Sequence, residues 1–434
     1  MINPSDVLKS ILAKKADQAE VFFSSSKTLK IDVLDQKVES IDEIEEQGIG
    51  IRVIKDNKLG FAYTSDFDET VLEETITRAI DNAANSEADE HNALPQKAEI
   101  TILNLFDEKI NRVPVAAKIK LALAIEKAAY AKDNKVKKTE KISYADSESE
   151  VWIVNSNGID AKYKSNYCGA HADVIAVQDH EMEAGFGLSY VTKFDDLNPE
   201  KVGAEAAQRA VQLLGARPIR SQKLSLVLDP FVSTQILEVI ASILSSDAAQ
   251  KGKSLFADKL GKQVGSKLLT IIDNGRLENG LATAPFDGEG VPTQETKLIE
   301  NGRLKTFFFN TYTANKGQTQ STGNAVRGSF KGLPMIGPTN LFIPAGKDDP
   351  KFFNQGFYVT RVMGVHTINP ISGDFSIGAS GILLENQQPV RGITIAGNLI
   401  ALLEKIEGIG SDLRFIANVG APTILISDIS IGGS

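Results

Sequence analysis

Histidine and cysteine are the residue types with which this chain could bind a metal or attack a substrate, and both are scarce. The sequence holds four histidines and one cysteine. His180 is followed by Glu181, as in a zinc-peptidase helix, but the next residues supply no second histidine. Zinc binding on a helix needs two histidines on one face, with the glutamate beside the bound water. We therefore expect His180 to lie in an exposed loop or hairpin.

Cys168 and His171 are separated by three positions, a spacing open to a nucleophile pair or to two metal ligands. No neighbouring residue completes either set. A lone cysteine forms neither an internal disulfide nor a multi-thiolate zinc site. The local pattern indicates a strand, and we expect both residues to be structural. The sequence also lacks a phosphate-binding loop and a Gly-x-Ser-x-Gly elbow.

The composition is that of a folded globular protein, with 42% apolar and 24% charged residues. Its 434 residues suit two or three domains. The net charge of −9 and pI near 5.2 argue against a nucleic-acid or anionic-membrane surface. The sequence has no apolar run long enough for a transmembrane helix and no signal-peptide pattern at its start. We expect a cytoplasmic protein that binds neither nucleic acid nor membrane.

The first half of the chain combines helical and strand patterns. Helices are predicted where apolar residues recur at helical spacing, over residues 7–12, 70–85, 115–132 and 199–214. Alternating segments predict strands over residues 19–23, 30–34, 149–155, 159–163 and 171–177. A further hairpin is predicted over 48–64, around Asp56-Asn57, and Asn157-Gly158 marks another turn. The polar stretch 85–97 is predicted to be a linker.

The second half of the chain has a different character. A short buried strand is predicted over 224–228, and Asp229-Pro230 should begin a helix over 231–245. After about residue 268, glycines, prolines and short apolar runs dominate, with a helical period only over 398–406. These patterns predict an α+β protein. An N-terminal α/β domain would span residues 1–220, and a β-rich, antiparallel, barrel-like domain residues 221–434.

Polar residues next to glycines recur at the ends of the C-terminal β segments. Turn formation and capping would explain each cluster singly. Together they predict a cleft for an extended peptide, because glycine permits close backbone approach and strand edges bind peptide backbones. The candidate binding residues are Asp287, Glu289, Thr322, Gly323, Asn324, Arg327, Asn340, Asp374 and Ser376. Three consecutive phenylalanines, 307–309, are interpreted as core rather than interface.

In order and spacing, these clusters resemble those of the TldD/PmbA family of proteases. The most specific segments are residues 287–293 (Asp-Gly-Glu-Gly-Val-Pro-Thr), 321–324 (Ser-Thr-Gly-Asn) and 372–376 (Ser-Gly-Asp-Phe-Ser). The resemblance covers essentially the whole chain. It implies two branches: TldD-type chains carry His-Glu-x-x-x-His on a helix and a cysteine ligand near the C-terminus, whereas PmbA-type (TldE) chains lack these ligands.

The resemblance places this chain in the PmbA branch. Matching residues 252–256 to the TldD branch without gaps puts the zinc motif at residues 237–242. Leu237 and Ser242 then stand at the histidine positions, and Glu238 at that of the catalytic glutamate. Residues 418–423 contain no cysteine. Leucine and serine cannot hold zinc, so we expect neither a metal nor catalytic residues in this chain.

The resemblance therefore implies a zinc-less subunit that forms part of a peptide-degrading or peptide-processing chamber. Its expected partners are a TldD-type subunit, which would hold the zinc, and unfolded peptides, and a homodimer is possible. Two alternatives stay open. One is a stand-alone metallopeptidase with a cryptic metal site around Cys168, His171 or His180. The other is a non-enzymatic, protein-binding modulator, since members of the family have been described as modulators of DNA gyrase.

Overall fold

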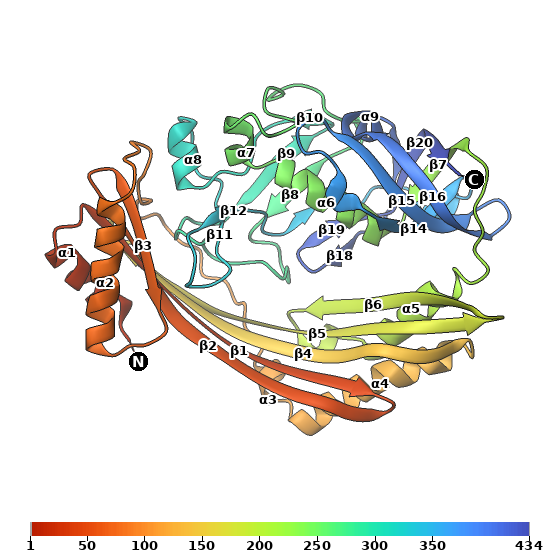
Figure 1. The fold of residues 1–434 in the computed structure, drawn as a ribbon, viewed down its shortest axis with the longest axis horizontal. Coiled ribbons are helices and arrows are strands. Elements are labelled where there is room, and N and C mark those ends of the chain that lie inside the picture. The colour runs from red at the N-terminus through yellow and green to blue at the C-terminus, as the bar shows by residue number, and fades with distance from the viewer. Residues whose placement is uncertain (1, 434) are drawn as a thin grey trace.

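A long, curved antiparallel sheet forms the base of the molecule in the computed structural model, which describes residues 2–433 (Figure 1). Its six strands lie in the order β3-β2-β1-β4-β5-β6. Their bounds are β1 (Gln18–Leu34), β2 (Lys37–Lys55), β3 (Lys58–Thr64), β4 (Val136–Asn155), β5 (Asp160–Gln178) and β6 (Glu181–Val191). All neighbouring pairs are antiparallel.

The strands of this sheet are longer than the sequence pattern predicts. Residues 19–23 and 30–34, predicted as separate segments, belong to the single strand β1, which pairs with β2 along its whole length. The intervening polar residues alternate between the two faces and do not interrupt pairing. Residues 37–47 of β2 pair only with β1, because β3 ends opposite Ile49. They form an exposed edge that is rich in Asp and Glu.

The predicted turns of the sheet are confirmed. Asp56 and Asn57 adopt positive φ values of 52° and 60° between β2 and β3, as a tight hairpin requires. Gly158, at 89°, occupies the turn between β4 and β5. His180 lies in the turn between β5 and β6 with φ 69°, so the expected hairpin is confirmed there too.

Helices cover the outer face and one end of the sheet. The helices are α1 (Pro4–Ala13), α2 (Glu69–Ala84), α3 (Glu108–Arg112), α4 (Val115–Lys132) and α5 (Pro199–Val211), with the 3₁₀ turn η1 (Phe194–Asp196). Figure 1 shows α1 and α2 at the left end and α4 beneath the strands. Alternate sheet residues, including Ile31 and Tyr144, pack with Ile125 of α4 and Ala206 of α5 in one apolar core.

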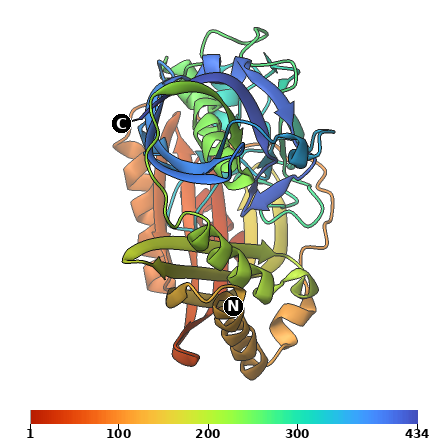
Figure 2. The ribbon, with the colours of Figure 1, turned by 90° about the vertical axis from the view of Figure 1, so that its right-hand side faces the viewer.

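A closed β-barrel lies above the sheet (Figure 2). It consists of β7 (Gln222–Leu228), β14 (Phe357–Met363), β15 (Asp374–Leu383), β16 (Gln388–Asn398) and β20 (Ile424–Gly432), and β17 (Ile406–Ile409) extends it from β20. Pairing of β16 with β20 closes the ring. The β14–β7 pair is parallel and the other pairs are antiparallel.

A second sheet and helix α6 (Pro230–Ile243) complete the C-terminal half. The strands of this sheet are, in spatial order, β10 (Arg303–Leu304), β9 (Glu295–Glu300), β8 (Ile271–Asn274), β13 (Leu341–Phe342), β19 (Val419–Ala421) and β18 (Arg414–Ile416). The helix α6 contacts both the barrel and this sheet. Its apolar side chains, such as Leu237 and Ile240, lie in the large core that joins them.

Short elements fill the remaining loops of the C-terminal half. They are the strands β11 (Ala325–Val326) and β12 (Met335–Ile336), which pair with each other, the helices α7 (Ser246–Gln250), α8 (Thr311–Lys316) and α9 (Leu399–Glu404), and the 3₁₀ turns η2 (Pro350–Phe352) and η3 (Val365–Thr367). No helix within residues 2–433 is long and apolar enough to cross a membrane.

The predicted α+β class and the barrel-like C-terminal half are confirmed. The prediction of antiparallel pairing holds except at β14–β7 and β13–β19, which are parallel. Phe307 and Phe308 are buried in the large core and Phe309 packs against it, which confirms the core interpretation. The last predicted helix, over residues 398–406, is shorter than expected, and in the structure it spans only Leu399–Glu404.

Two buried ionic clusters join the N-terminal sheet and helices to the C-terminal half. The first, around Arg52, belongs to the candidate site described below. In the second, Arg209 of α5 contacts Glu205 at 3.0 Å and Asp229 at 3.1 Å. Asp229 is also the N-cap of α6, accepting a hydrogen bond from the Phe231 N–H. Arg414 of β18 donates to Glu205 at 2.7 Å. This cluster therefore ties the start of α6 to α5.

We predict that Gly203→Ala destabilises the protein although alanine favours helix formation. A Cβ atom at Gly203 of α5 would lie 2.0 Å from the Ile125 carbonyl oxygen of α4. The two helices would have to separate, at a cost of about 1–3 kcal/mol. Urea unfolding measures the change. Gly332→Ala, where the added Cβ meets no atom within 4 Å, is the matched control and should stay near wild type. Equal stability of the two variants would contradict the prediction.

Candidate functional site

Two arginines and two glutamates form a buried ionic network between the two halves of the molecule. Arg52 of β2 donates to Glu20 of β1 at 2.6 Å and to Glu289, in the loop before β9, at 2.7 Å. Arg327, just after β11, also pairs with Glu20. None of the four side chains is more than 7% exposed. The network consequently fixes the paired strands β1 and β2 against the loops that precede β9 and follow β11.

The charges of this network are balanced by one another rather than by water. Burial opposes ionisation of Glu289, but the charge and hydrogen bond of Arg52 hold its pKa below the usual value. Burial and repulsion from Arg52 lower the pKa of Arg327 despite the attraction of Glu20. Arg327 also donates to the Gly288 carbonyl at 2.7 Å and stacks on Phe22, 4.5 Å from the ring centre.

Asp287 lies beside the network as a buried carboxyl that forms no ion pair with any residue in the range 2–433. Burial and the neighbouring charge of Glu289 raise its pKa to about 7. Its oxygens accept hydrogen bonds from the backbone N–H groups of Glu289, Val291 and Ala325, at 2.9, 3.0 and 3.0 Å. Asp287 therefore shapes the loop that presents Glu289.

Most of the other predicted binding residues also hold loops in place. Thr322 bonds to the backbone of Phe309, and Gly323 adopts φ 73°. Asn324 donates to Asp273 at 2.8 Å, and Asn340 bridges the Ala282 N–H and the Asn274 carbonyl. These four residues, with Asp287 and Arg327, lie in the interior.

Of the other three predicted residues, two are exposed and the third, Glu289, is buried but lines a pocket. Asp374 and Ser376 are exposed on β15, where Asp374 accepts a hydrogen bond from Asn398 at 3.0 Å. Glu289 lies at the base of a pocket, far along the chain from those two. Six of the nine predicted residues therefore hold loops in place, and the other three lie at two separate locations.

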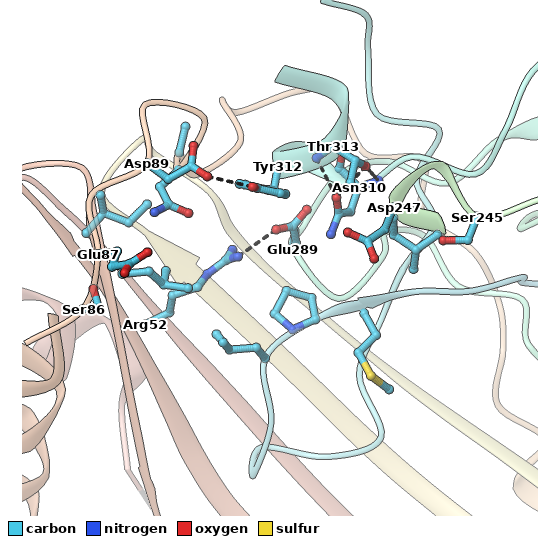
Figure 3. Close-up of a pocket in the computed structure, with 18 residues that line it drawn as sticks. Arg52, Ser86, Glu87, Asp89, Ser245, Asp247, Glu289, Asn310, Tyr312 and Thr313 are labelled. Carbon is cyan, nitrogen blue, oxygen red and sulfur yellow. Dashed lines mark hydrogen bonds and ion pairs between the residues drawn. The ribbon is translucent and has the colours of Figure 1, made fainter. Parts of the chain in front are cut away.

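The pocket at Glu289, here called the junction pocket, has a volume of about 640 Å³ (Figure 3). The Arg52–Glu289 ion pair forms part of its floor. Its walls come from four segments: the β2–β3 hairpin, residues 86–93, the α7–α8 region and residues 333–336. Tyr312 of α8 donates to Asp89 at 2.8 Å across one side. Sequence reasoning missed this pocket, because Asp89 lies in the polar stretch that was interpreted only as a linker.

Helix α6, on which the sequence analysis predicts the degenerate zinc motif, borders a second pocket, of about 510 Å³. Glu238 and Ser242 line it together with Gln235, facing His366 and neighbouring residues of η3. Burial raises the pKa of Glu238. Leu237 points elsewhere: it is fully buried in the apolar core. Residues five apart on an α-helix are separated by roughly 140°, so Leu237 and Ser242 face different directions.

The side chains of α6 do not fit a zinc ion. Leu237 offers no donor atom, and the Ser242 hydroxyl donates to the Val239 carbonyl of its own helix at 2.7 Å. Zinc sites use imidazole, thiolate or carboxylate ligands, of which α6 presents only Glu238 to this pocket. Within residues 2–433, no three His, Cys, Asp or Glu side chains come close enough to hold a metal.

The residues considered for a cryptic metal site are kept apart by the first sheet. Cys168 belongs to the core beneath the sheet, and burial raises the pKa of its thiol to about 12. His171 lies on the opposite face of β5, beside a small pocket lined also by Lys30 and Lys141. His180 occupies the β5–β6 turn. The geometry brings no pair of these side chains together.

Comparison with known proteins identifies the class to which this chain corresponds, the metallopeptidases. Sequence models described as PmbA/TldA metallopeptidase domain 1, central domain and C-terminal domain match residues 19–86, 108–214 and 221–433. The chain belongs to the PmbA/TldD metallopeptidase family. It is 29% identical to the metalloprotease PmbA of Escherichia coli O157:H7, over 96% of this chain and 93% of that protein. An uncharacterized Methanocaldococcus jannaschii protein is 31% identical, over 84% of each chain.

Solved structures agree with this assignment. A Thermotoga maritima protein described as a candidate modulator of a DNA gyrase superposes with a TM-score of 0.89 and 27% identity, over 99% of both chains. TldE from Thermococcus kodakarensis superposes with a TM-score of 0.90, again over 99% of both chains. Its identity of 21% supports the shared fold alone.

We predict that Arg52→Met destabilises the protein by about 3–5 kcal/mol, because it leaves Glu20 and Glu289 buried with less compensating charge. Chemical denaturation measures the loss. The matched control is Arg276→Met at an exposed position, which should change stability by less than about 0.5 kcal/mol. A similarly small effect of Arg52→Met would show that the network contributes little to the fold.

Asp287 should make the folded state less stable as the pH rises from about 4 to about 7. Its pKa is about 7 when folded but near 3.8 when unfolded, so the unfolded state ionises first and gains stability over this range. The loss is on the order of 3 kcal/mol. Asp287→Asn removes this titration but also one backbone acceptor, so the variant is less stable at pH 4.

Unfolding free energies of wild type and Asp287→Asn, measured at several pH values, test this effect of pH. The stability advantage of wild type should narrow between pH 4 and pH 7, since only wild type carries the titrating carboxyl. An advantage that stays constant across this range would contradict the assigned pKa.

Proposed function

We propose that this chain is the PmbA/TldE-type, non-zinc subunit of a TldD/TldE peptidase complex. The observation that carries the proposal is helix α6. It lies in the family fold with Glu238 beside an open pocket, yet its remaining side chains offer no zinc ligand set. A partner with a TldD-type zinc site would supply the metal chemistry, which is the attack of a metal-activated water on a peptide bond.

In this proposal the chain contributes shape and binding surface to the peptide chamber. The concave side of the first sheet faces the C-terminal half in Figure 1, and the two pockets of about 640 and 510 Å³ open at different places in the molecule. The ionic clusters around Arg52 and Arg209 would keep these surfaces in fixed positions. Unfolded peptides are the proposed substrates, because an extended chain can reach separated sites.

The two alternative functions have less support. A stand-alone metallopeptidase would need ligands that converge, whereas Cys168, His171 and His180 lie in three different environments. A role as a protein-binding modulator of DNA gyrase would rest on the description of the Thermotoga maritima relative. Association with a second copy of this chain is compatible with the main proposal. The measurement of assembly size described below would detect it.

Reconstitution with a TldD-type chain from the same source tests the proposal. Each chain is purified alone and the two are then mixed, and zinc content, assembly size and cleavage of an unfolded peptide are measured. This chain alone should hold no stoichiometric zinc and cleave nothing, whereas the mixture should form a hetero-oligomer and cleave the peptide. A partner with both motif histidines changed to alanine is the control for zinc-dependent cleavage. Stoichiometric zinc and cleavage in this chain alone would reject the proposal.

A further inference from the structure

The junction pocket combines acidic groups with exposed apolar surface. Figure 3 shows Glu87 and Asp247 on opposite sides of the open space, with Arg52 and Glu289 between them. The apolar lining comes from Ile54, Leu59, Leu333, Pro334, Met335 and Ile336. Leu333 is 38% exposed and Met335 72% exposed, so both side chains offer apolar surface to an occupant of the pocket.

The pocket has a negative charge that its own residues do not cancel. Arg52 is already neutralised by Glu20 and Glu289 within the ionic network. Glu87, Asp89 and Asp247 remain; the exposed Lys251 contacts Asp247 at 2.8 Å, and the charge of Lys316 acts on Asp89. The lining itself holds four carboxylates and one arginine. Hydrogen bonds from the His91 N–H and from Tyr312 lower the pKa of Asp89, which keeps it ionised. The pocket therefore favours a positively charged occupant.

The arrangement fits an extended organic cation better than a metal ion. The carboxylates stand on different walls, and within residues 2–433 no three potential ligands are close enough to share a metal. A Lys or Arg side chain has an apolar stem and a charged end, and it can satisfy an apolar wall and an acidic wall together.

A further feature indicates that the cation belongs to a peptide. Among the described residues β12 pairs only with β11, so one edge of Met335–Ile336 is free for backbone hydrogen bonds.

We infer that the junction pocket binds a basic residue of an extended peptide. Glu87 and Asp247 attract the charged end, and Leu333 and Met335 cover the apolar stem. The inference does not depend on pairing with a zinc subunit, because binding can be measured on this chain alone. The preference for Lys or Arg is inferred for the junction pocket alone, because the α6 pocket has a single carboxylate among its lining residues.

Binding of two labelled peptides to the full-length chain tests this inference. The first is acetyl-Ala-Leu-Lys-Leu-Ala-amide, and the second carries norleucine in place of lysine, which keeps the stem and removes the charge. Fluorescence anisotropy should show about tenfold tighter binding of the lysine peptide, with the advantage decreasing as salt is added. Equal affinities, or no binding of either peptide, would overturn the inference.

Charge-neutralising variants locate the binding. Glu87→Gln/Asp247→Asn should reduce the lysine advantage to less than about threefold and leave the norleucine peptide unchanged. The matched control, Asp258→Asn/Glu404→Gln, removes two exposed carboxylates outside the pocket and should leave the advantage intact. An unchanged advantage in the pocket variant would overturn the location. Free butane-1,4-diamine that competes as effectively as the lysine peptide would assign the pocket to small amines, against a peptide.

Discussion

The buried contact of Arg52 with Glu20 and Glu289 is the interaction on which the arrangement of the two halves depends. A buried ion pair need not stabilise a protein more than an apolar contact of equal size would. It is, however, intolerant of displacement, because moving one partner leaves the other charged and away from water. Arg52 and Glu289 are 237 positions apart in the sequence. Their contact therefore selects one relative position of the sheet and the loops of the C-terminal half.

The second ionic cluster acts at the other end of the same junction. Arg209 links α5 to Asp229, the residue that caps α6. Through this contact α6 is oriented by the N-terminal half as well as by its own core. The junction pocket and the α6 pocket share no lining residue, but they are close in the chain, since Ser242 lines the α6 pocket and Ser245 the junction pocket.

Local signals in the sequence were sufficient for turns, helix starts and fold class. The turn at Asp56-Asn57 and the helix start at Asp229-Pro230 follow from the conformational preferences of these residues themselves. A short stretch of sequence is therefore enough to predict them. The site depends on distant contacts. Asp287 and Asn324 could be recognised as special but not as interior scaffold, because burial is set by the tertiary fold. Asp89 carries no pattern at all, since its role arises only when α8 packs beside it.

The position of Leu237 bears on any attempt to build a metal site into α6. By the ungapped match Leu237 stands at a predicted ligand position, and in this chain it fills the apolar core between the barrel and the second sheet. A histidine there would bury an imidazole among aliphatic side chains, where its nitrogen atoms would lose their hydrogen bonds to water. Substitution at the two motif positions would therefore cost core stability as well as change the chemistry of the pocket.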